Sequence, residues 1–176
     1  MLFWSKIEKG LICYKDKCHQ LLFQNKILNL ILSPIKKDKI HMNYWLVKSE
    51  PESYSWDDLQ KKGEDIWDGI RNYQARNFLK EMKLGEKVLF YHSGKPKEIV
   101  GIAEVSAEAF SDPNDKDDKG WVAVKLRPLE VLAKPVTLEQ IKTDDQLEDL
   151  LLLKQSRLSV MSVNKSQYDH IIKLST

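Results

Sequence analysis

Cysteine is nearly absent from this sequence: the 176 residues contain two, Cys13 and Cys18, and none follows residue 41. A disulfide framework needs several spaced cysteines, so none is expected, and such a composition is typical of a reducing compartment. Residues 42–176 also lack any thiol nucleophile. We therefore expect a cytoplasmic protein, or a nuclear one if the source is a eukaryote.

Glycine is scarce as well, with seven residues, and long apolar runs are missing. The sequence contains no phosphate-binding loop, dinucleotide fingerprint or zinc-hydrolase helix. No segment approaches the roughly 20 apolar residues that cross a bilayer. Cys13, Cys18 and His19 make at most a partial zinc site, because a fourth ligand is missing. The sequence thus predicts no cofactor, no bound metal and no membrane partner.

The net charge of +2 conceals an uneven distribution. Residues 1–41 hold eight lysines and three acids, whereas residues 42–176 hold 20 basic and 23 acidic side chains. Any nucleic acid bound by the larger segment must therefore be held by a local site, not by a general positive field. For residues 1–41 we favour a non-family extension, disordered or mis-started, with Met42 as the functional start. The alternative is a basic arm for a membrane surface or nucleic acid.

Hydrophobic periodicity in residues 42–176 predicts about five or six strands, with short helices between and after them. The strands are expected at 43–48, 66–69, 87–92, 99–110, 121–126 and 156–163. The helices are expected at 56–62, 73–82, 137–142 and from the Asn164 cap to Ile172. Residues 111–120, rich in Asp and Lys, predict an exposed loop. Because no regular βαβ alternation is present, we expect one α+β domain, a small mixed β-barrel with flanking short helices, and a monomer.

The stretch at 66–77 reads Ile-Trp-Asp-Gly-Ile-Arg-Asn-Tyr-Gln-Ala-Arg-Asn. It is too polar for a core segment and too aromatic for an idle loop. Aromatic faces beside fixed donors and acceptors suit a planar, polar ligand. We expect Trp67 to Asn72 to form one wall of a nucleobase pocket, with Gly69 at a turn. Asn72 should also cap the helix that follows.

Polar side chains follow three other predicted strands. In a small barrel, strand ends converge at one mouth, where ligands enter. A base there could stack on Trp67 or Trp121, which contributes about 1–3 kcal/mol per stacked base. The strand-end residues expected beside it are Lys48, Ser49, Glu50, Tyr91, His92, Arg157 and Ser159.

Two other functions remain open. A small hydrolase or base-modifying enzyme would use His92 with Ser49, Glu50 or Asp68, because a Ser-His-acid arrangement activates a hydroxyl. Nothing in the spacing of these residues singles that arrangement out. The other alternative is an adaptor that binds a protein through an exposed face.

Five segments resemble the EVE domain family in order and spacing, from about Met42 to the C-terminus. They are Tyr-Trp-Leu-Val-Lys-Ser-Glu-Pro at 44–51, Trp-Asp-Gly-Ile-Arg-Asn-Tyr-Gln-Ala-Arg-Asn at 67–77, Phe-Tyr-His-Ser at 90–93, Ile-Val-Gly-Ile-Ala-Glu-Val at 99–105 and Arg-Leu-Ser-Val-Met at 157–161. The resemblance implies a PUA-like barrel related to YTH domains, which hold a methylated base in an aromatic cage.

The resemblance also implies a non-catalytic reader of modified bases, such as modified cytosines, in DNA or RNA. It predicts that Trp67→Ala abolishes the preference for modified bases and leaves the fold intact. The nucleobase-binding residues implied by the resemblance are Lys48, Ser49, Glu50, Trp67, Asp68, Gly69, Arg71, Asn72, Tyr91, His92, Trp121, Arg157 and Ser159.

Overall fold

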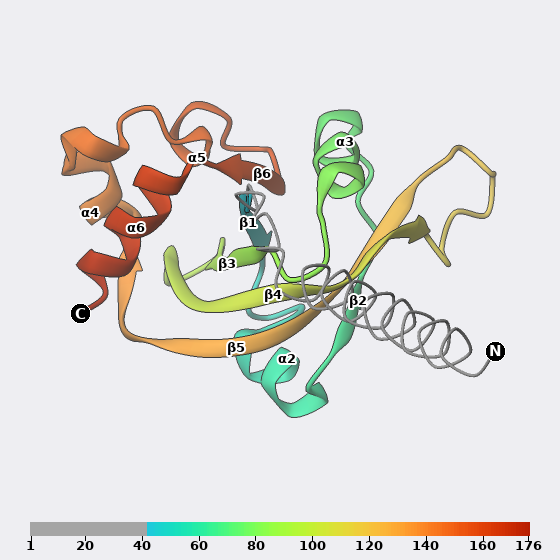
Figure 1. Ribbon diagram of the computed structural model, residues 1–176, viewed down its shortest axis with the longest axis horizontal. Coiled ribbons are helices and arrows are strands. Elements are labelled where there is room, and N and C mark those ends of the chain that lie inside the picture. The colour runs from blue at the N-terminus through green and yellow to red at the C-terminus, as the bar shows by residue number, and fades with distance from the viewer. Residues whose placement is uncertain (1–41) are drawn as a thin grey trace, which may run out of the picture. The chain divides into compact units, whose positions relative to one another are not determined.

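Six strands form one mixed sheet in the computed structural model, which describes residues 42–176 (Figure 1). They are β1 Tyr44–Ser49, β2 Asp65–Trp67, β3 Lys87–His92, β4 Glu98–Ser111, β5 Val122–Thr137 and β6 Val160–Val163. The order is β2-β5-β4-β3-β1-β6, in which β1 and β3 run parallel and every other neighbouring pair is antiparallel. The α+β class and the number of strands are confirmed. The sheet itself is open, because within the described residues β2 and β6 remain as two separate edges.

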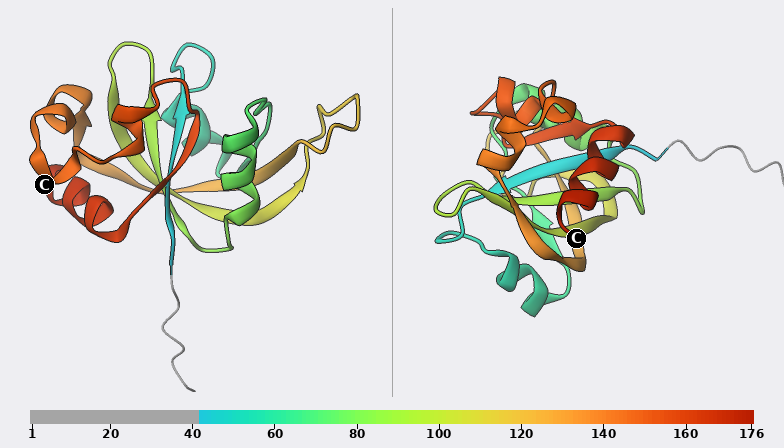
Figure 2. Two further views of the ribbon diagram at one scale, coloured as in Figure 1. Left: turned by 90° about the horizontal axis from the view of Figure 1, so that it is seen from above. Right: turned by 90° about the vertical axis from the view of Figure 1, so that its left-hand side faces the viewer.

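Short helices surround the sheet. They are α2 Trp56–Lys62, α3 Tyr73–Glu81, α4 Leu138–Thr143, the 3-10 turn η1 Asp145–Leu147, α5 Leu151–Lys154 and α6 Lys165–Leu174. The last three helices gather at one end of the sheet, whereas α2 and α3 lie on opposite sides of it (Figures 1 and 2). None of the helices in the described part of the chain is long and apolar enough to span a membrane.

Side-chain caps start α2, α3 and α6 where the sequence predicts helices. The Ser55 hydroxyl accepts from the backbone of Asp58 at the start of α2, and the Asp58 side chain bonds back. The Asn72 side chain caps α3, and that of Asn164 caps α6. Each cap satisfies a backbone N–H that a first helical turn leaves unpaired, which stabilises the helix by about 1 kcal/mol. The predicted helix starts are therefore confirmed.

Gly101 brings β4 against α2. A Cβ built at this glycine would lie 2.5 Å from two ring carbons of Trp56, too close for any side chain. The Trp56 ring is 3% exposed and meets Phe90 edge-on, with the ring centroids 5.3 Å apart. This close approach lets a tryptophan lie directly on the sheet.

The fifth strand is longer than predicted. The sequence predicted its end at Leu126, just before Arg127 and Pro128, yet β5 continues to Thr137. Proline cannot donate to a strand ladder, but Pro128 pairs with Ala103 beside a shift in the β4–β5 register. A bulge tolerates the missing donor, so the strand passes through the proline.

Two further predictions need correction. The loop at 111–120 was expected to be exposed, but Asp112 within it is 4% exposed. The last strand begins at Val160 rather than 156, because a turn in which Leu158 donates to the carbonyl of Gln155 precedes it. The predictions for residues 1–41, including Cys13, Cys18 and His19, lie outside the described residues.

Candidate functional site

Two pockets border the end of β1. The first, here the Trp67 pocket, measures about 480 Å³ and is lined by Lys48, Ser49, Tyr54, Lys62, Asp65, Ile66, Trp67, Asp68 and Ile70. The second, the Tyr91 pocket, measures about 460 Å³ and is lined by Lys48, Glu50, Tyr91, Ser93, Lys97, Leu138, Leu152, Ser156, Arg157 and Ser159. Lys48 borders both. The structure therefore divides eight of the predicted residues between two hollows rather than around one mouth.

The Trp67 pocket has an aromatic wall. Trp67 ends β2 and is 9% exposed. Its ring meets those of Tyr54 and Phe90 edge-on, with centroids 6.0 and 5.5 Å away. Such contacts add about 0.5–1.5 kcal/mol beyond burial, so the indole is held in place without a ligand. Its buried Nε1 hydrogen has no hydrogen-bond partner within residues 42–176.

Polar groups around this pocket have well-defined protonation states. The Tyr54 hydroxyl donates to the Asp65 carboxylate at 2.7 Å, and Lys62 donates to the same oxygen at 2.5 Å. Burial and the neighbouring carboxylate raise the pKa of Tyr54. Burial also acts to raise the pKa of Asp65, but its bonds from Lys62 and Tyr54 outweigh this and lower it. At neutral pH the pocket thus offers a phenol, an ionised carboxylate and a lysine beside an indole ring.

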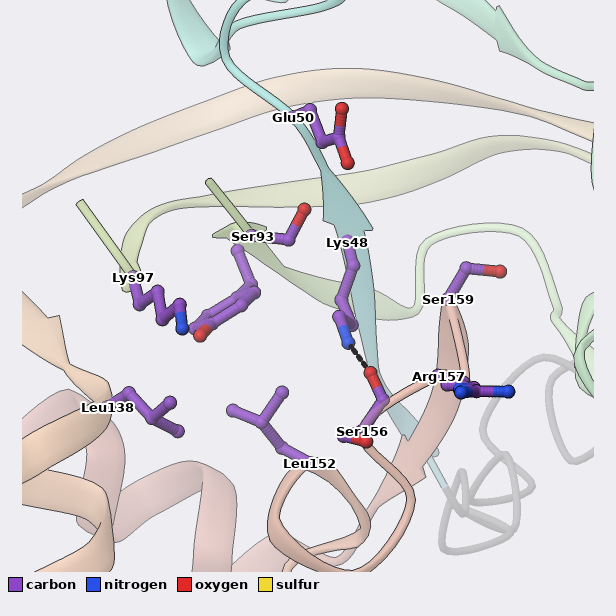
Figure 3. A pocket seen from close by; sticks show the side chains of 10 residues that line it. Lys48, Glu50, Ser93, Lys97, Leu138, Leu152, Ser156, Arg157 and Ser159 are labelled. Carbon is purple, nitrogen blue, oxygen red and sulfur yellow. Dashed lines mark hydrogen bonds between the residues drawn. The ribbon is translucent and has the colours of Figure 1, made fainter. Parts of the chain in front are cut away.

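The Tyr91 pocket combines cations with an apolar side. Lys48 donates from its ammonium group to the backbone carbonyl of Ser156. Figure 3 shows this contact, with Lys97 on the opposite side of the hollow near Leu138 and Leu152. Burial lowers the pKa of Lys48, because leaving water disfavours the charged ammonium. An anion bound here would offset that penalty.

Five residues that the sequence predicted to contact the base do not line either pocket. Gly69, Arg71 and Asn72 follow the wall that holds Trp67, while His92 and Trp121 lie at the ends of other elements. The Asn72 side chain is occupied as the cap of α3. The polar groups of Gly69, Arg71 and His92 are likewise occupied by partners within the fold.

A buried carboxylate connects the Trp67 wall to the β4–β5 loop. Asp112 accepts from the backbone N–H of Gly69 at 3.0 Å and from the Arg71 guanidinium at 2.6 Å. Asn114, two residues on, donates its amide to Asp68 at 2.9 Å. Burial acts to raise the pKa of Asp112, but these donors, Arg71 foremost, outweigh it and lower the value. The carboxylate therefore stays ionised and holds the pocket wall in position.

Trp121 belongs to a separate aromatic stack. Its ring centroid lies 5.0 Å from that of Tyr73, which is 63% exposed. The guanidinium groups of Arg71 and Arg76 lie 5.6 and 5.5 Å from the Trp121 ring. Arg76 also donates to the Gly120 carbonyl at 3.5 Å. This stack braces α3 against the loop.

His92 and Ser49 do not form a catalytic pair. The His92 Nε2 atom accepts from the backbone N–H of Trp56 at 3.1 Å, so the lone pair that a general base needs is already used. The Ser49 hydroxyl donates to the Tyr54 carbonyl at 2.7 Å. These contacts fasten α2 and its preceding loop to the ends of β1 and β3.

The His92 contact predicts a pH dependence of stability. Burial lowers the pKa of His92 and outweighs the opposite effects of Glu98 and Asp57. The unfolded chain therefore binds the His92 proton more readily than the folded chain does. The contribution of neutral His92 to the free energy of unfolding is complete above about pH 6.5, and it is lost as the pH falls through the pKa of His92 in the folded chain. We expect the free energy of unfolding to fall by at most about 1.4 kcal/mol per pH unit in that window.

Urea unfolding of the wild type and of His92→Gln between pH 4.5 and 8 measures this effect. The difference between the two curves isolates His92, because both proteins keep His170 and every carboxylate. A difference that does not change with pH would show that the His92 proton is not linked to folding.

Several pocket residues were not indicated by the sequence pattern. Tyr54 and Asp65 belong to the Trp67 pocket, Lys97 belongs to the Tyr91 pocket, and Asp112 supports the wall. Tyr54 stands between Pro51 and a helix cap, a position that a search for strand ends passes over. Asp112 begins a run of charged residues typical of a solvated loop, so no local signal distinguishes it.

Comparison with known proteins shows which family this chain resembles. The EVE domain model matches residues 43–174. Thymocyte nuclear protein 1 of Mus musculus is 37% identical over 165 residues, or 75% of this chain and 73% of that protein. A crystal structure from Agrobacterium tumefaciens has a TM-score of 0.74 and 39% identity, covering 76% of this chain and 92% of that chain.

Human THYN1 protein has been solved in complex with DNA containing 5-methylcytosine. It is 33% identical with a TM-score of 0.69, covering 76% of this chain and 97% of that chain. The family match and the relatives at more than 30% identity agree with the five motifs found in the sequence. This chain belongs to the EVE domain family.

Proposed function

We propose that this chain binds nucleic acid and recognises a modified base, such as a modified cytosine, in the Trp67 pocket. The observation that carries the proposal is the placement of the indole ring of Trp67 beside the carboxylates of Asp65 and Asp68 in a hollow of about 480 Å³. The human relative solved with 5-methylcytosine DNA supports it. The pocket's volume falls within the range typical of small-ligand sites.

Each side of the pocket suits one part of a nucleotide. An indole ring offers a base a stacking surface, and a carboxylate can accept from an exocyclic amine. Ile66 and Ile70 add apolar surface where a methyl group can be buried. Burying one such group contributes about 0.8 kcal/mol from area alone and up to roughly 3 kcal/mol in a shaped pocket. Preference for a modified base should therefore be about tenfold rather than absolute.

The pocket also requires a base that has left its stack. A side pocket reads a base only after the nucleotide is extruded or in a single strand, and extrusion costs a few kcal/mol. We propose that single-stranded or weakly paired sites bind more tightly than intact duplex. No reaction is proposed, because Ser49 and His92 are occupied by Tyr54 and Trp56.

A binding screen with single-stranded 9-mers tests the proposal. Each carries one central cytosine, 5-methylcytosine, adenine or N6-methyladenine, and affinity is measured by fluorescence anisotropy at fixed salt. We expect one modified oligonucleotide to bind about tenfold more tightly than its unmodified counterpart. Equal affinities for both modified and unmodified members of each pair would refute base reading by this pocket.

The finer predictions remain proposals. We propose that the curved sheet is an open variant of the PUA-like barrel and that residues 42–176 are the functional module, acting as a monomer. Residues 1–41 are proposed to be dispensable for it. For a eukaryotic source we propose a nuclear location, in line with the name of the thymocyte nuclear protein relatives.

A further inference from the structure

The Tyr91 pocket is positively charged on an otherwise acidic domain. Three cations line it, Lys48, Lys97 and Arg157, against the single carboxylate of Glu50. Residues 42–176 as a whole carry 20 basic and 23 acidic side chains. Basic groups gathered at one hollow of an acidic body favour an anionic ligand there, because the local field acts within about 8 Å in physiological salt.

Within residues 42–176 these cations have no ionic partner. Lys97 and Arg157 make no salt bridge within residues 42–176, and Lys48 donates to a neutral carbonyl. By contrast, Lys62, beside the Trp67 pocket, is neutralised by Asp65. The cations of the Tyr91 pocket thus remain available to a ligand.

The other walls of the pocket suit the rest of a nucleotide. Tyr91 is 2% exposed and Leu152 is 5% exposed, so this side presents a firm, mostly apolar surface. Leu138 lies near it in Figure 3. Hydroxyl groups of Ser93 and Ser159 add neutral donors. Such a combination matches a sugar or base on one side and a phosphate on the other.

Lys48 links the two pockets. It lies one residue before the end of β1 and borders both hollows. A strand whose base enters the Trp67 pocket therefore has its neighbouring nucleotide close to the Tyr91 pocket. We propose that the Tyr91 pocket binds the phosphate of a nucleotide adjacent to the read base, through Lys48, Lys97 and Arg157. This inference rests on the proposed function, since the phosphate belongs to the strand that carries the base.

The double variant Lys97→Gln/Arg157→Gln tests this inference. Both residues are exposed, so the fold should be preserved, which a thermal melt checks. Affinity is measured across a salt series for 9-mers with central cytosine or 5-methylcytosine, and by NMR titration for 5-methyl-2′-deoxycytidine, which lacks a phosphate. The matched control is Lys80→Gln/Lys173→Gln, which removes the same charge from exposed lysines outside both pockets.

We expect the test variant to weaken both oligonucleotides by the same factor and to leave nucleoside binding unchanged. The slope of log affinity against log salt should fall by about 0.7 for each phosphate that the variant no longer neutralises. The control pair should change the slope much less. Equal slopes for test and control variants, or a loss of nucleoside binding in the test variant, would overturn the inference. If the wild type binds both 9-mers equally, base reading fails while the salt slopes still decide the phosphate site.

Discussion

Replacing Trp67 by alanine is expected to abolish the preference for a modified base and to lower the free energy of unfolding by roughly 3–5 kcal/mol. The first effect follows because the indole forms the aromatic wall of its pocket. The second follows because the ring is 9% exposed and packs against Tyr54 and Phe90. The sequence alone predicted an intact fold for this variant, and the burial of the ring leads us to expect destabilisation.

A matched pair of variants separates binding from stability. Trp67→Leu and Trp56→Leu both remove a buried indole that packs on Phe90 and whose Nε1 has no partner within residues 42–176. Only Trp67 lines the proposed base pocket. Both variants should lose stability in urea unfolding, but only Trp67→Leu should lose discrimination between modified and unmodified 9-mers. Discrimination kept by a folded Trp67→Leu protein would place the base elsewhere.

Asp112→Ala is expected to destabilise the domain by about 2–3 kcal/mol and to weaken binding of the modified base. The side chain is fully buried and holds both Gly69 and Arg71, so its loss leaves a backbone donor and a guanidinium without their partner. Arg71 is partly exposed and can regain water, which limits the cost. The wall after Trp67 would then be free to move, and a pocket with a mobile wall binds less tightly because ordering it costs entropy.

Asp117→Ala serves as the control in the same loop. Its carboxylate is 67% exposed and, among residues 42–176, pairs with Lys119 alone, so a change within about 0.5 kcal/mol is expected. The difference in the free energy of unfolding between Asp112→Ala and Asp117→Ala should also depend on pH. Because Arg71 and the backbone donors lower the pKa of Asp112 despite its burial, its contribution is present above about pH 4 and is lost as the pH falls through the folded value. Equal stability of the two variants at pH 7 would contradict the role given to Asp112.

Much of the fold could be predicted from the sequence, because the contacts that form its elements join residues close together in the chain. Caps at Ser55, Asn72 and Asn164 depend on a backbone N–H three residues away, so the pattern and the contact occupy the same short segment. Strand β3 matches its predicted range because four consecutive buried residues follow one another in sequence.

The residues of the candidate site could be predicted from the sequence only in part. The sequence indicated that Lys48 and Ser49 leave β1 and that Trp67 ends a short extended passage, and both lie at the Trp67 pocket. It did not indicate that Tyr91 and Arg157 face a second hollow. Both sets of residues follow strand ends, and strand ends look alike in sequence whichever side of the sheet they open onto.

The sequence by itself therefore determined the α+β class, the family and most element boundaries, because periodicity, caps and motif order are properties of neighbouring residues. Tertiary structure decided that β5 passes through Pro128, that Asp112 is buried beneath Gly69 and Arg71, and that the site is two pockets. Those outcomes depend on contacts such as that between Gly69 and Asp112, which are 43 residues apart. Sheet register and packing decide which of several similar carboxylates contacts a distant donor. Neither of them can be predicted from a local sequence pattern.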